Sequence, residues 1–508
     1  MSAETTKNKK NINIVIALGV IVLLAVLRVM YLETTFVDLT PDEAQYWLWS
    51  KYPDWSYYSK GPLVAWLISV STYMFGDTIL GVKFFAILGM GILSLLSFIL
   101  ARNWQGDKAG FYAIALINAT PLLGVGGLLM VPDMPVAVLW AAAILVLSSE
   151  SGFFAGWKRF IIIGFLIGLA GLAKYTAGLF YPLVAIYFLA NKKRSIWLIK
   201  PHIYVSGIIS LLCLTPIFIW NYLHDYAGFK HVLGQMGGEG NTSWLDTVSN
   251  FLGGQAAVTG GFIFIFLLAY WFLYKVDKGS EKGKIFWWFS APLFAFFCFK
   301  AFGAKVQPNW PVLSIFIGFI GLSGWLTLRE KSVQVLFIIT LVLSASLTFI
   351  GHDTHMLRHM GIDLPAKKDP LKPALGWHGL GEQITKRLQV LPEHIPVLTT
   401  RYQTASALSF YIKNSAGKRP EMLYVNPGYR RQNQFDYWPW PAMSSVLYIN
   451  EASVLESVIK QGFNECNFIE RIKSTRENPN GEELVLKQAS LYLCVGYLGI
   501  DRFKADKF

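Results

Sequence analysis

Apolar runs close to 20 residues long recur through the first 350 residues, separated by short polar stretches. A helix needs about 20 mostly apolar residues to cross the hydrocarbon core of a bilayer. The candidate spans are residues 12–31, 78–101, 109–130, 135–149, 160–174, 177–190, 203–221, 257–274, 285–300, 310–327 and 333–350. The pattern predicts a mostly α-helical, polytopic membrane protein with about 11 spans.

Two of the apolar runs need interpretation. Residues 12–31 have the length of a signal peptide, but no small-residue cleavage site follows them, so we expect a retained span. Residues 63–75 are too few for an ordinary span, and counting them as one would invert every later loop. We therefore interpret this run as an interfacial or re-entrant helix.

Basic residues fall in short clusters between the apolar runs, and this distribution explains the net charge of +13 better than a nucleic-acid partner does. The positive-inside rule places such clusters in the cytoplasm. The clusters lie at 7–10, 102–108, 158–159, 192–194, 275–284 and 329–331. The N-terminus is then cytoplasmic. The outward loops are 32–61, 131–134, 175–176, 222–256 and 301–309, together with the tail from 352.

The tail is long enough for a domain of its own. Its short apolar runs predict strands at 395–400, 422–425, 446–449 and 491–495, with helices at 405–412 and 452–461. We expect a membrane module at 1–350, including the outward loop 32–61 with its interfacial helices. A periplasmic α/β or α+β domain is expected at 351–508.

The four cysteines divide between the two parts of the chain. Cys213 and Cys298 fall in predicted spans, where small apolar packing is the ordinary role. Cys466 and Cys494 lie in the tail. An oxidising periplasm would allow these two to form a disulfide, and two free buried thiols are the alternative.

Carboxylates mark two of the outward loops. Asp42 and Glu43 follow Thr40 and Pro41, a pattern typical of a helix start. A general base at the membrane surface is a compatible second role. Asp133 stands between two long apolar runs, where a carboxylate needs water or a partner, or caps a turn. If the two loops share a face, Asp42 and Asp133 can bracket a substrate.

Basic and aromatic groups accompany the carboxylates. Lys60, Lys174 and Lys305 on the outward side fit recognition of a phosphorylated lipid, although a lone interfacial lysine commonly snorkels. The aromatic residues of loop 32–61, Tyr46 and Tyr58 among them, suit an interfacial belt, with sugar stacking as the alternative. His224 beside Asp225 is a weak metal pattern or a polar loop. The sequence contains no Walker loop, Rossmann glycine pattern, HExxH or GxSxG.

Taken in order, these residues resemble the GT-C superfamily of glycosyltransferases that use lipid-linked sugars, specifically bacterial members of glycosyltransferase family 39. These include the aminoarabinose and galacturonic acid transferases of lipid A and core. The resemblance rests on the segments 42–47, 60–62, 132–133, 171–176, 220–221, 307–311, 376–377, 401–403, 410–411 and 433–438.

The resemblance implies an inverting enzyme that moves a sugar from a polyprenyl (undecaprenyl) phosphate to an envelope acceptor at the periplasmic face. That acceptor is lipid A or lipopolysaccharide core, or a protein in a protein O-mannosyltransferase-like enzyme. Asp42 corresponds to the catalytic base and Asp133 to a supporting carboxylate. The residues expected to bind substrate are Glu43, Tyr46, Tyr58, Lys60, Lys83, Lys174, Tyr175, Asn221, Lys305 and Asn309.

The resemblance leaves metal use open. The aminoarabinose transferases have an acidic residue before the phosphate-binding lysine, whereas Ser59 stands before Lys60 here. The resemblance calls for no particular cofactor, and a divalent metal stays an open alternative with Glu43 and His224 as its candidate ligands. We expect a monomer in the bacterial inner membrane, surrounded by membrane lipids. A lipid-linked sugar transporter or flippase is the alternative of another class, and it would place ionisable groups deep inside spans.

Overall fold

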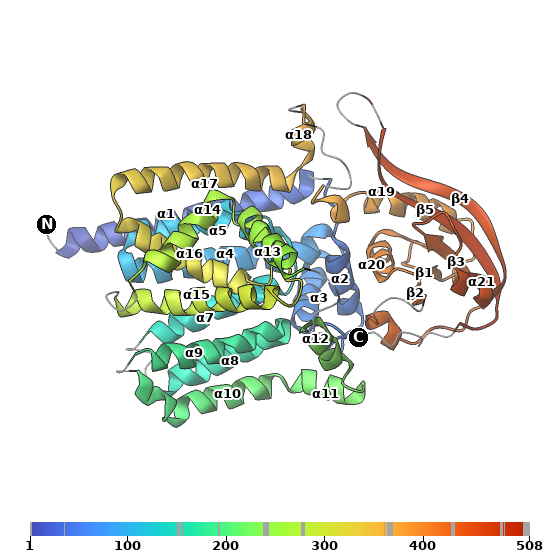
Figure 1. Ribbon diagram of the computed structural model, residues 1–508. Helices are drawn as coiled ribbons and strands as arrows, with labels where there is room; N and C mark the ends of the chain where they lie inside the picture. Colours follow the sequence, from blue (N-terminus) through green and yellow to red (C-terminus); the bar gives the residue numbers. More distant parts are fainter. Residues whose placement is uncertain are drawn as a thin grey trace.

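A computed structural model shows a long helical body with a mixed sheet at one end (Figure 1). It describes residues 3–34, 36–149, 154, 156–191, 194–236, 243–275, 280–359, 361–362, 369–427, 432–477, 481 and 483–500. We call residues 369–500, which contain the sheet and its helices, the cap. The boundary predicted between 350 and 351 stays a prediction.

Helices make up the whole body. In chain order they are α1 (Ala3–Thr34), α2 (Pro41–Lys51), α3 (Leu63–Phe75), α4 (Ile79–Gln105), α5 (Asp107–Ala119), α6 (Pro121–Gly124), α7 (Asp133–Ser148), α8 (Trp157–Ala173), α9 (Phe180–Leu189), α10 (Pro201–Cys213), α11 (Thr215–Leu223), α12 (Ala227–Met236), α13 (Trp244–Val258), α14 (Phe262–Leu273), α15 (Glu281–Ala301), α16 (Val312–Thr327), α17 (Lys331–His352) and α18 (His355–His359). Helix α16 is buried along almost its entire length, so it forms the centre of the body.

Two predicted spans are bent, and a third begins later than predicted. The run 109–130 breaks at Pro121 by 73°, and the run 203–221 breaks beside Pro216 by 46°. A proline supplies no backbone N–H and clashes with the preceding turn. The run 257–274 begins only at Phe262, because Gly260 and Gly261, both at positive φ, turn the chain by 108° after α13. Helices α12 and α13 occupy a stretch that we expected to be a loop.

Length and composition mark three described helices as able to cross a membrane, namely those containing Ile12–Thr34, Ile79–Gln105 and Lys331–His352. The number rises to six if each bent pair counts as one span, and further apolar helices are shorter. The total of about 11 spans therefore stays a prediction. The run 63–75 forms the separate 13-residue helix α3.

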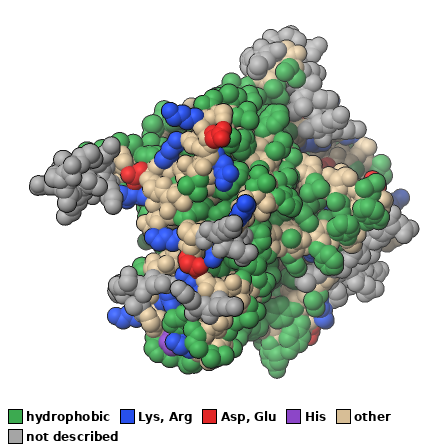
Figure 2. Space-filling view, turned by 60° about the vertical axis from the view of Figure 1, so that its left-hand side comes forward, with side chains coloured by type: hydrophobic (Ala, Val, Ile, Leu, Met, Phe, Trp, Pro, Cys, Tyr) green, Lys and Arg blue, Asp and Glu red, His purple; other side chains and the backbone are tan. Residues whose placement is uncertain are grey.

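The basic clusters gather at one end of the helical body, as the positive-inside rule requires. Figure 2 shows Lys and Arg side chains spread over this end. Contacts join the clusters across the sequence: Lys282 Nζ donates to the Asn103 carbonyl at 2.9 Å, and Lys108 hydrogen-bonds Gln334. Arg194 lies 3.6 Å from Glu281. In Figure 1 the cap lies at the other end.

The cap is built on a five-stranded sheet with the order β2-β1-β3-β5-β4. Its elements are α19 (Trp377–Leu388), β1 (Val397–Thr399), α20 (Tyr402–Tyr411), β2 (Met422–Tyr424), β3 (Ser445–Asn450), α21 (Ser457–Gly462), β4 (Phe463–Glu477) and β5 (Glu483–Tyr497). Strand β1 runs parallel to β2 and β3, whereas β5 is antiparallel to β3 and β4. The four predicted strands are confirmed. Strand β4 and helix α19 were not predicted, because most of β4 is polar and only partly buried.

The cap is held against α2 and the loop before it. Trp47 packs edge-on against Phe410, with ring centroids 5.0 Å apart. Asp38 accepts hydrogen bonds from the Trp377 and His378 amides at 2.7 and 3.2 Å. Much of the aromatic loop is therefore an internal contact surface, and its buried rings do not form the interfacial belt expected from the sequence.

A buried ion pair lies beneath α2. Lys83 Nζ on α4 is 2.6 Å from Glu43 Oε1, with 2% and 0% of the two side chains exposed. The same oxygen accepts from the Met130 amide at 3.0 Å, and Oε2 accepts from the Thr40 amide and hydroxyl, each at 3.0 Å. Lys83 also donates to the Leu128 carbonyl at 3.1 Å. The Glu43 carboxylate thus joins α2, α4 and the segment before α7.

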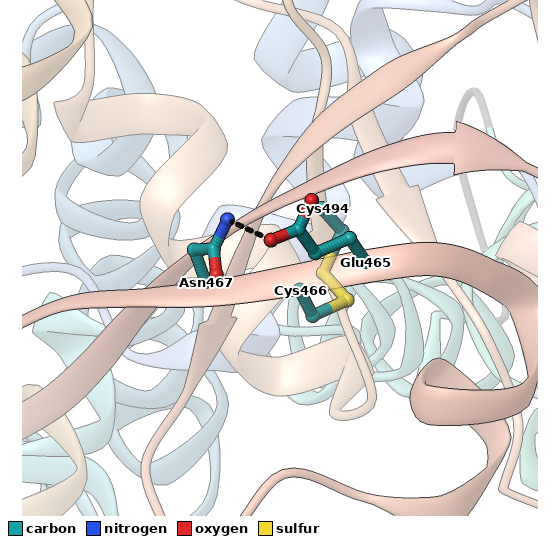
Figure 3. Close-up of a disulfide and its surroundings, with 4 residues drawn as sticks. All are labelled: Glu465, Cys466, Asn467 and Cys494. Atoms are coloured by element: carbon teal, nitrogen blue, oxygen red, sulfur yellow. Dashed lines mark hydrogen bonds between the residues drawn. A yellow bond between two sulfur atoms is a disulfide. The ribbon is translucent and has the colours of Figure 1, made fainter.

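Cys466 and Cys494 form a disulfide between the paired strands β4 and β5 (Figure 3). Beside it, Asn467 Nδ2 donates to Glu465 Oε1 at 2.9 Å on the exposed face of the hairpin. The sequence left two alternatives for Cys466 and Cys494, a disulfide or two free thiols, and the structure has the disulfide. Cys213 and Cys298 are free.

Replacing Lys83 with methionine should lower the free energy of unfolding by about 3–5 kcal/mol, because it leaves a buried carboxylate without its cation. Thermal unfolding of the detergent-solubilised protein measures the change. The matched control is Lys51→Met, which removes an ion pair of the same 2.6 Å length with Asp77 that is 35% and 26% exposed. This control should cost at most about 1 kcal/mol. Equal losses in the two variants would contradict the structural role of Glu43 and Lys83.

Alkylation of the denatured, unreduced protein should modify Cys213 and Cys298 only, because Cys466 and Cys494 are joined. Reduction before alkylation should raise the count from two modified thiols to four. Mass spectrometry of peptides measures both states. Four alkylated cysteines before reduction would show that the disulfide does not form in the cell.

Candidate active site

Asp42, Lys60, Asp133 and Lys174 come together although they are far apart in sequence. Lys174 Nζ lies 2.7 Å from Asp133 Oδ1, and Asn309 Nδ2 donates to Asp133 Oδ2 at 3.1 Å. Lys60 interacts electrostatically with Asp42, Asp133 and Lys174. The expected juxtaposition of Asp42 and Asp133 is therefore observed in the fold.

The start of α2 sets the position of Asp42. Thr40 caps the helix: its hydroxyl accepts from the Glu43 amide at 3.2 Å, while the Glu43 carboxylate accepts from the Thr40 amide, which completes a capping box. Pro41 occupies the first helical turn, where no amide donor is needed. Glu43 therefore supplies the cap, and the neighbouring Asp42 carboxylate is left to face the cavity.

The pKa values of Asp42 and Lys60 shift in opposite directions. The Asp42 carboxylate reaches water but is surrounded by the cavity walls, and this enclosure raises its pKa, although Lys60 acts in the opposite direction. Burial, assisted by Lys174, lowers the pKa of Lys60 to about 8 against the attraction of Asp133 and Asp42. Perturbed pKa values of this kind cluster at functional sites.

A cavity of about 860 Å³ opens in front of Asp42, between the body and the cap. The body contributes Pro41, Asp42, Gln45, Tyr46, Tyr58, Ser59, Lys60, His231 and Gln235, and the cap contributes Trp377, Arg401, Tyr402, Gln403, Gln432, Asn433, Glu451 and Lys487. Tyr46 lies near both Asp42 and Asp133, and burial raises the pKa of its phenol. The expected site residues Tyr46, Tyr58 and Lys60 thus share one cavity with Asp42.

Other expected site residues lie elsewhere. Glu43 and Lys83 are enclosed in the buried ion pair, so their role is structural, contrary to the substrate contact expected from the sequence. Asn221 is fully buried and accepts from the Phe229 amide at 3.0 Å, which fixes the turn between α11 and α12. Lys305 is exposed, away from the cavity lining.

The two remaining aromatic or imidazole candidates also pack against protein. Tyr175 packs beside Phe229, with ring centroids 6.4 Å apart. His224 stacks on Trp220 at 4.1 Å, and its Nδ1 contacts the Trp220 carbonyl at 2.8 Å. Neither residue lines the cavity. Both side chains therefore pack against other residues outside the cavity lining.

A metal site does not emerge from the described part of the chain, where no group of three or more His, Cys, Asp or Glu side chains is arranged to hold an ion. Both Glu43 oxygens already accept hydrogen bonds, and His224 packs on Trp220. The two candidate ligands named from the sequence thus have separate structural partners.

Sequence reasoning did not assign His231 and Gln235 on α12, or Glu451 and Lys487 in the cap, to the site. Only the docking of the cap onto the body brings these side chains to the cavity, and no local motif signals such an approach. The segment Arg401–Gln403 is one of those that carry the family resemblance, but the sequence alone does not indicate its role in the site.

The chain matches proteins of known family. Residues 59–220 match the family model described as dolichyl-phosphate-mannose-protein mannosyltransferase. The lipid A galacturonosyltransferase RgtD of Rhizobium johnstonii is 27% identical over 315 residues, which cover 59% of this chain and 63% of that protein. The match thus spans less than two thirds of this curated relative.

Solved structures share the fold. The crystal structure of ArnT from Cupriavidus metallidurans bound to undecaprenyl phosphate aligns with a TM-score of 0.63 at 14% identity, covering 93% of this chain and 98% of that one. The apo structure of the same protein gives a TM-score of 0.62, with the same identity and coverage. The partial sequence matches and the shared fold thus make the chain similar to proteins that are named as glycosyltransferases.

Proposed function

We propose that the protein transfers a sugar from a polyprenyl phosphate to lipid A or lipopolysaccharide core, with inversion at the anomeric carbon. The observation that carries the proposal is the cavity that holds Asp42 and Lys60 beside the Asp133–Lys174 pair. Among the described residues, neither the Asp42 carboxylate nor the Lys60 ammonium has a hydrogen-bond partner. Both groups are thus available to a substrate.

The reaction that this arrangement supports is a single displacement. The acceptor hydroxyl attacks the anomeric carbon while Asp42 takes its proton, and the bond from that carbon to the phosphate oxygen breaks. The polyprenyl phosphate leaves with the bonding electrons, and Lys60 stabilises its charge. Lys174, held by Asp133, adds a second positive charge. If the acceptor atom is a phosphate oxygen, it is already ionised, and Asp42 then positions it. Attack opposite the leaving group inverts the anomeric configuration.

The proposed orientation places the cap in the periplasm of a bacterial inner membrane and the N-terminus in the cytoplasm. The basic end of the body, opposite the cap, supports it (Figures 1 and 2). The disulfide in the cap is in keeping with an oxidising compartment. We propose that the protein acts as a monomer.

Lipid A or core is proposed as the acceptor because the sequence relative is named a lipid A galacturonosyltransferase. The family model named for protein mannosyltransferases makes a protein acceptor the second candidate, and its match is confined to residues 59–220. Mass spectrometry of lipid A, core and envelope proteins from cells with and without the chain separates the two. Loss of a sugar from a protein, with lipid A and core unchanged, would overturn the first proposal.

Asp42→Asn should reduce transfer by about 10²–10⁴-fold while leaving the protein folded, because it removes the proton acceptor and keeps the shape of the side chain. Asp133→Asn should also impair transfer severely, since it releases Lys174 and weakens the contact with Asn309. Product formation with a purified lipid-linked donor measures both. Asp246→Asn, on the exposed start of α13, is the matched control and should retain activity. Normal turnover of both site variants would refute the assignment.

The pH profile of kcat/KM should be bell-shaped. Asp42 acts as a carboxylate, so the rate falls as the pH drops through its raised pKa. Lys60 acts as a cation, so the rate falls as the pH rises through about 8. Lys60→Arg should move the alkaline limb upward because a guanidinium stays protonated there. Lys60→Ala should weaken use of the donor, seen as a higher donor KM. An alkaline limb unchanged in Lys60→Arg would rule out Lys60 as its source.

A further inference from the structure

A second cavity, of about 410 Å³, lies beside the first, and both are lined by Glu451 and Lys487. Apart from Glu451, its walls come from three places in the sequence. These are Phe36 and Val37 after α1; residues 353–355, 369, 371, 372 and 375 after α17; and Arg476 with residues 484–488 of the β4–β5 hairpin. The sugar-transfer chemistry proposed above uses none of these walls. Because the two cavities share these lining residues, the second cavity is adjacent to the candidate active site.

Two candidate membrane spans end beside the second cavity. Helices α1 and α17 both have the length and composition of a span, and only 11% and 28% of their apolar windows are buried inside the protein. The Tyr31 hydroxyl donates to the His352 carbonyl, which joins the cap-side ends of the two helices. Figure 1 shows the ends of α1 and α17 nearest the cap at the same end of the body as the β4–β5 hairpin. The cavity therefore lies where lipid head groups leave the hydrocarbon.

An exposed aromatic ring lines the second cavity. Phe36 is 69% exposed, and the Arg476 guanidinium lies 4.2 Å from its ring centroid. An apolar ring with a cation beside it is suited to the boundary between acyl chains and anionic head groups. Phe36 and Arg476 both line the second cavity.

Two lysines of the second cavity are close together without a carboxylate partner. Lys487 Nζ donates to the Lys372 carbonyl at 3.2 Å, and its ammonium lies 4.5 Å from the Trp377 ring centroid. Among the described residues, neither Lys372 nor Lys487 forms a salt bridge. Burial lowers the pKa of Lys487 and Lys372 adds to this effect, while Glu451 and Asp38 oppose it. An anion placed between the two ammonium groups would relieve their repulsion.

The carboxylates of the second cavity are engaged in holding its loops. Asp369 accepts from the Thr354 hydroxyl at 3.0 Å and from the Leu371 amide at 2.8 Å. Asp353 accepts from the His355 amide at 2.9 Å. Glu451 accepts from the Thr404 hydroxyl and lies 3.6 Å from Arg401. The acidic side chains thus stabilise the walls, and the ammonium groups of Lys372 and Lys487 remain for a ligand.

We propose that the second cavity binds the anionic head group of the acceptor lipid, which enters from the membrane surface beside α1 and α17. A negatively charged group on the acceptor sugar, such as a phosphate, lies between Lys372, Arg476 and Lys487. The attacking oxygen then reaches Asp42 past the shared wall at Glu451 and Lys487. This inference rests on the proposed function and gives it a substrate class: a glycolipid that carries negative charge on its head group.

The test uses the full chain in detergent, a lipid-linked sugar donor, and lipid A with and without its phosphates. The double variant Lys372→Gln/Arg476→Gln should raise the KM for phosphorylated lipid A about tenfold, because two cations are lost. The KM for the dephosphorylated lipid and for the donor should change less than twofold. The charge-preserving variant Lys372→Arg/Arg476→Lys should restore the KM, which separates loss of charge from loss of folding. Lys460→Gln, exposed on α21, is the matched control and should behave as wild type.

An unchanged KM for phosphorylated lipid A in the double variant would overturn the inference, as would an equal rise for both lipids. Inorganic phosphate distinguishes a lipid head group from a free anion. If phosphate alone stabilises the wild type in a thermal-shift assay while both lipids give the same KM, the cavity binds the free anion and the inference fails. Transfer that still depends on Asp42 in these cases would leave the proposed function standing. Absence of transfer to any lipid by the wild type would overturn both.

Discussion

The carboxylate of Glu43 is the interaction on which the geometry of the site depends. It is fully enclosed, and it accepts from Lys83, from the Met130 amide and from the amide and hydroxyl of Thr40. A buried charge is tolerated only when its partners compensate for the lost hydration. These donors come from α2, from α4 and from the segment that leads to Asp133. One side chain thereby fixes the two loops that carry Asp42 and Asp133, the carboxylates proposed to be catalytic.

The adjacent residues Asp42 and Glu43 have opposite environments, and this difference separates their roles. Glu43 points into protein, where every lone pair has a donor and the side chain cannot reach a substrate. Asp42 points into the cavity, where water reaches it and Lys60 lies nearby. Glu43 is therefore held in place by its hydrogen bonds, whereas the adjacent Asp42 carboxylate is accessible from the cavity. The helix cap is the device that orients both, since the capping box needs Glu43 to turn back toward Thr40.

The cap completes the site by closing the open side of the helical body. The body alone provides Asp42, Lys60 and the Asp133–Lys174 pair, which suffice for a chemical centre. The cap adds Arg401, Glu451, Lys487 and other polar groups along the opposite wall. Its attachment uses contacts such as Asp38 with the Trp377 amide and Trp47 with Phe410. The cap thus shapes the space in front of Asp42, and under the proposed function it offers surface to a second substrate.

The sequence by itself determined the mostly helical architecture with its long apolar runs, the grouping of the basic clusters and four of the strands. It also named Asp42 and Lys60 as candidate site residues, and the two line one cavity. These features follow from local composition and periodicity, because a long apolar run, a helix cap and an alternating strand each act over a few residues. The tertiary structure alone decided that Lys83 pairs with Glu43, and that His231 and Lys487 reach the cavity. Those outcomes depend on contacts between residues tens to hundreds of positions apart. The spacing of residues along the chain does not indicate which distant side chains will meet.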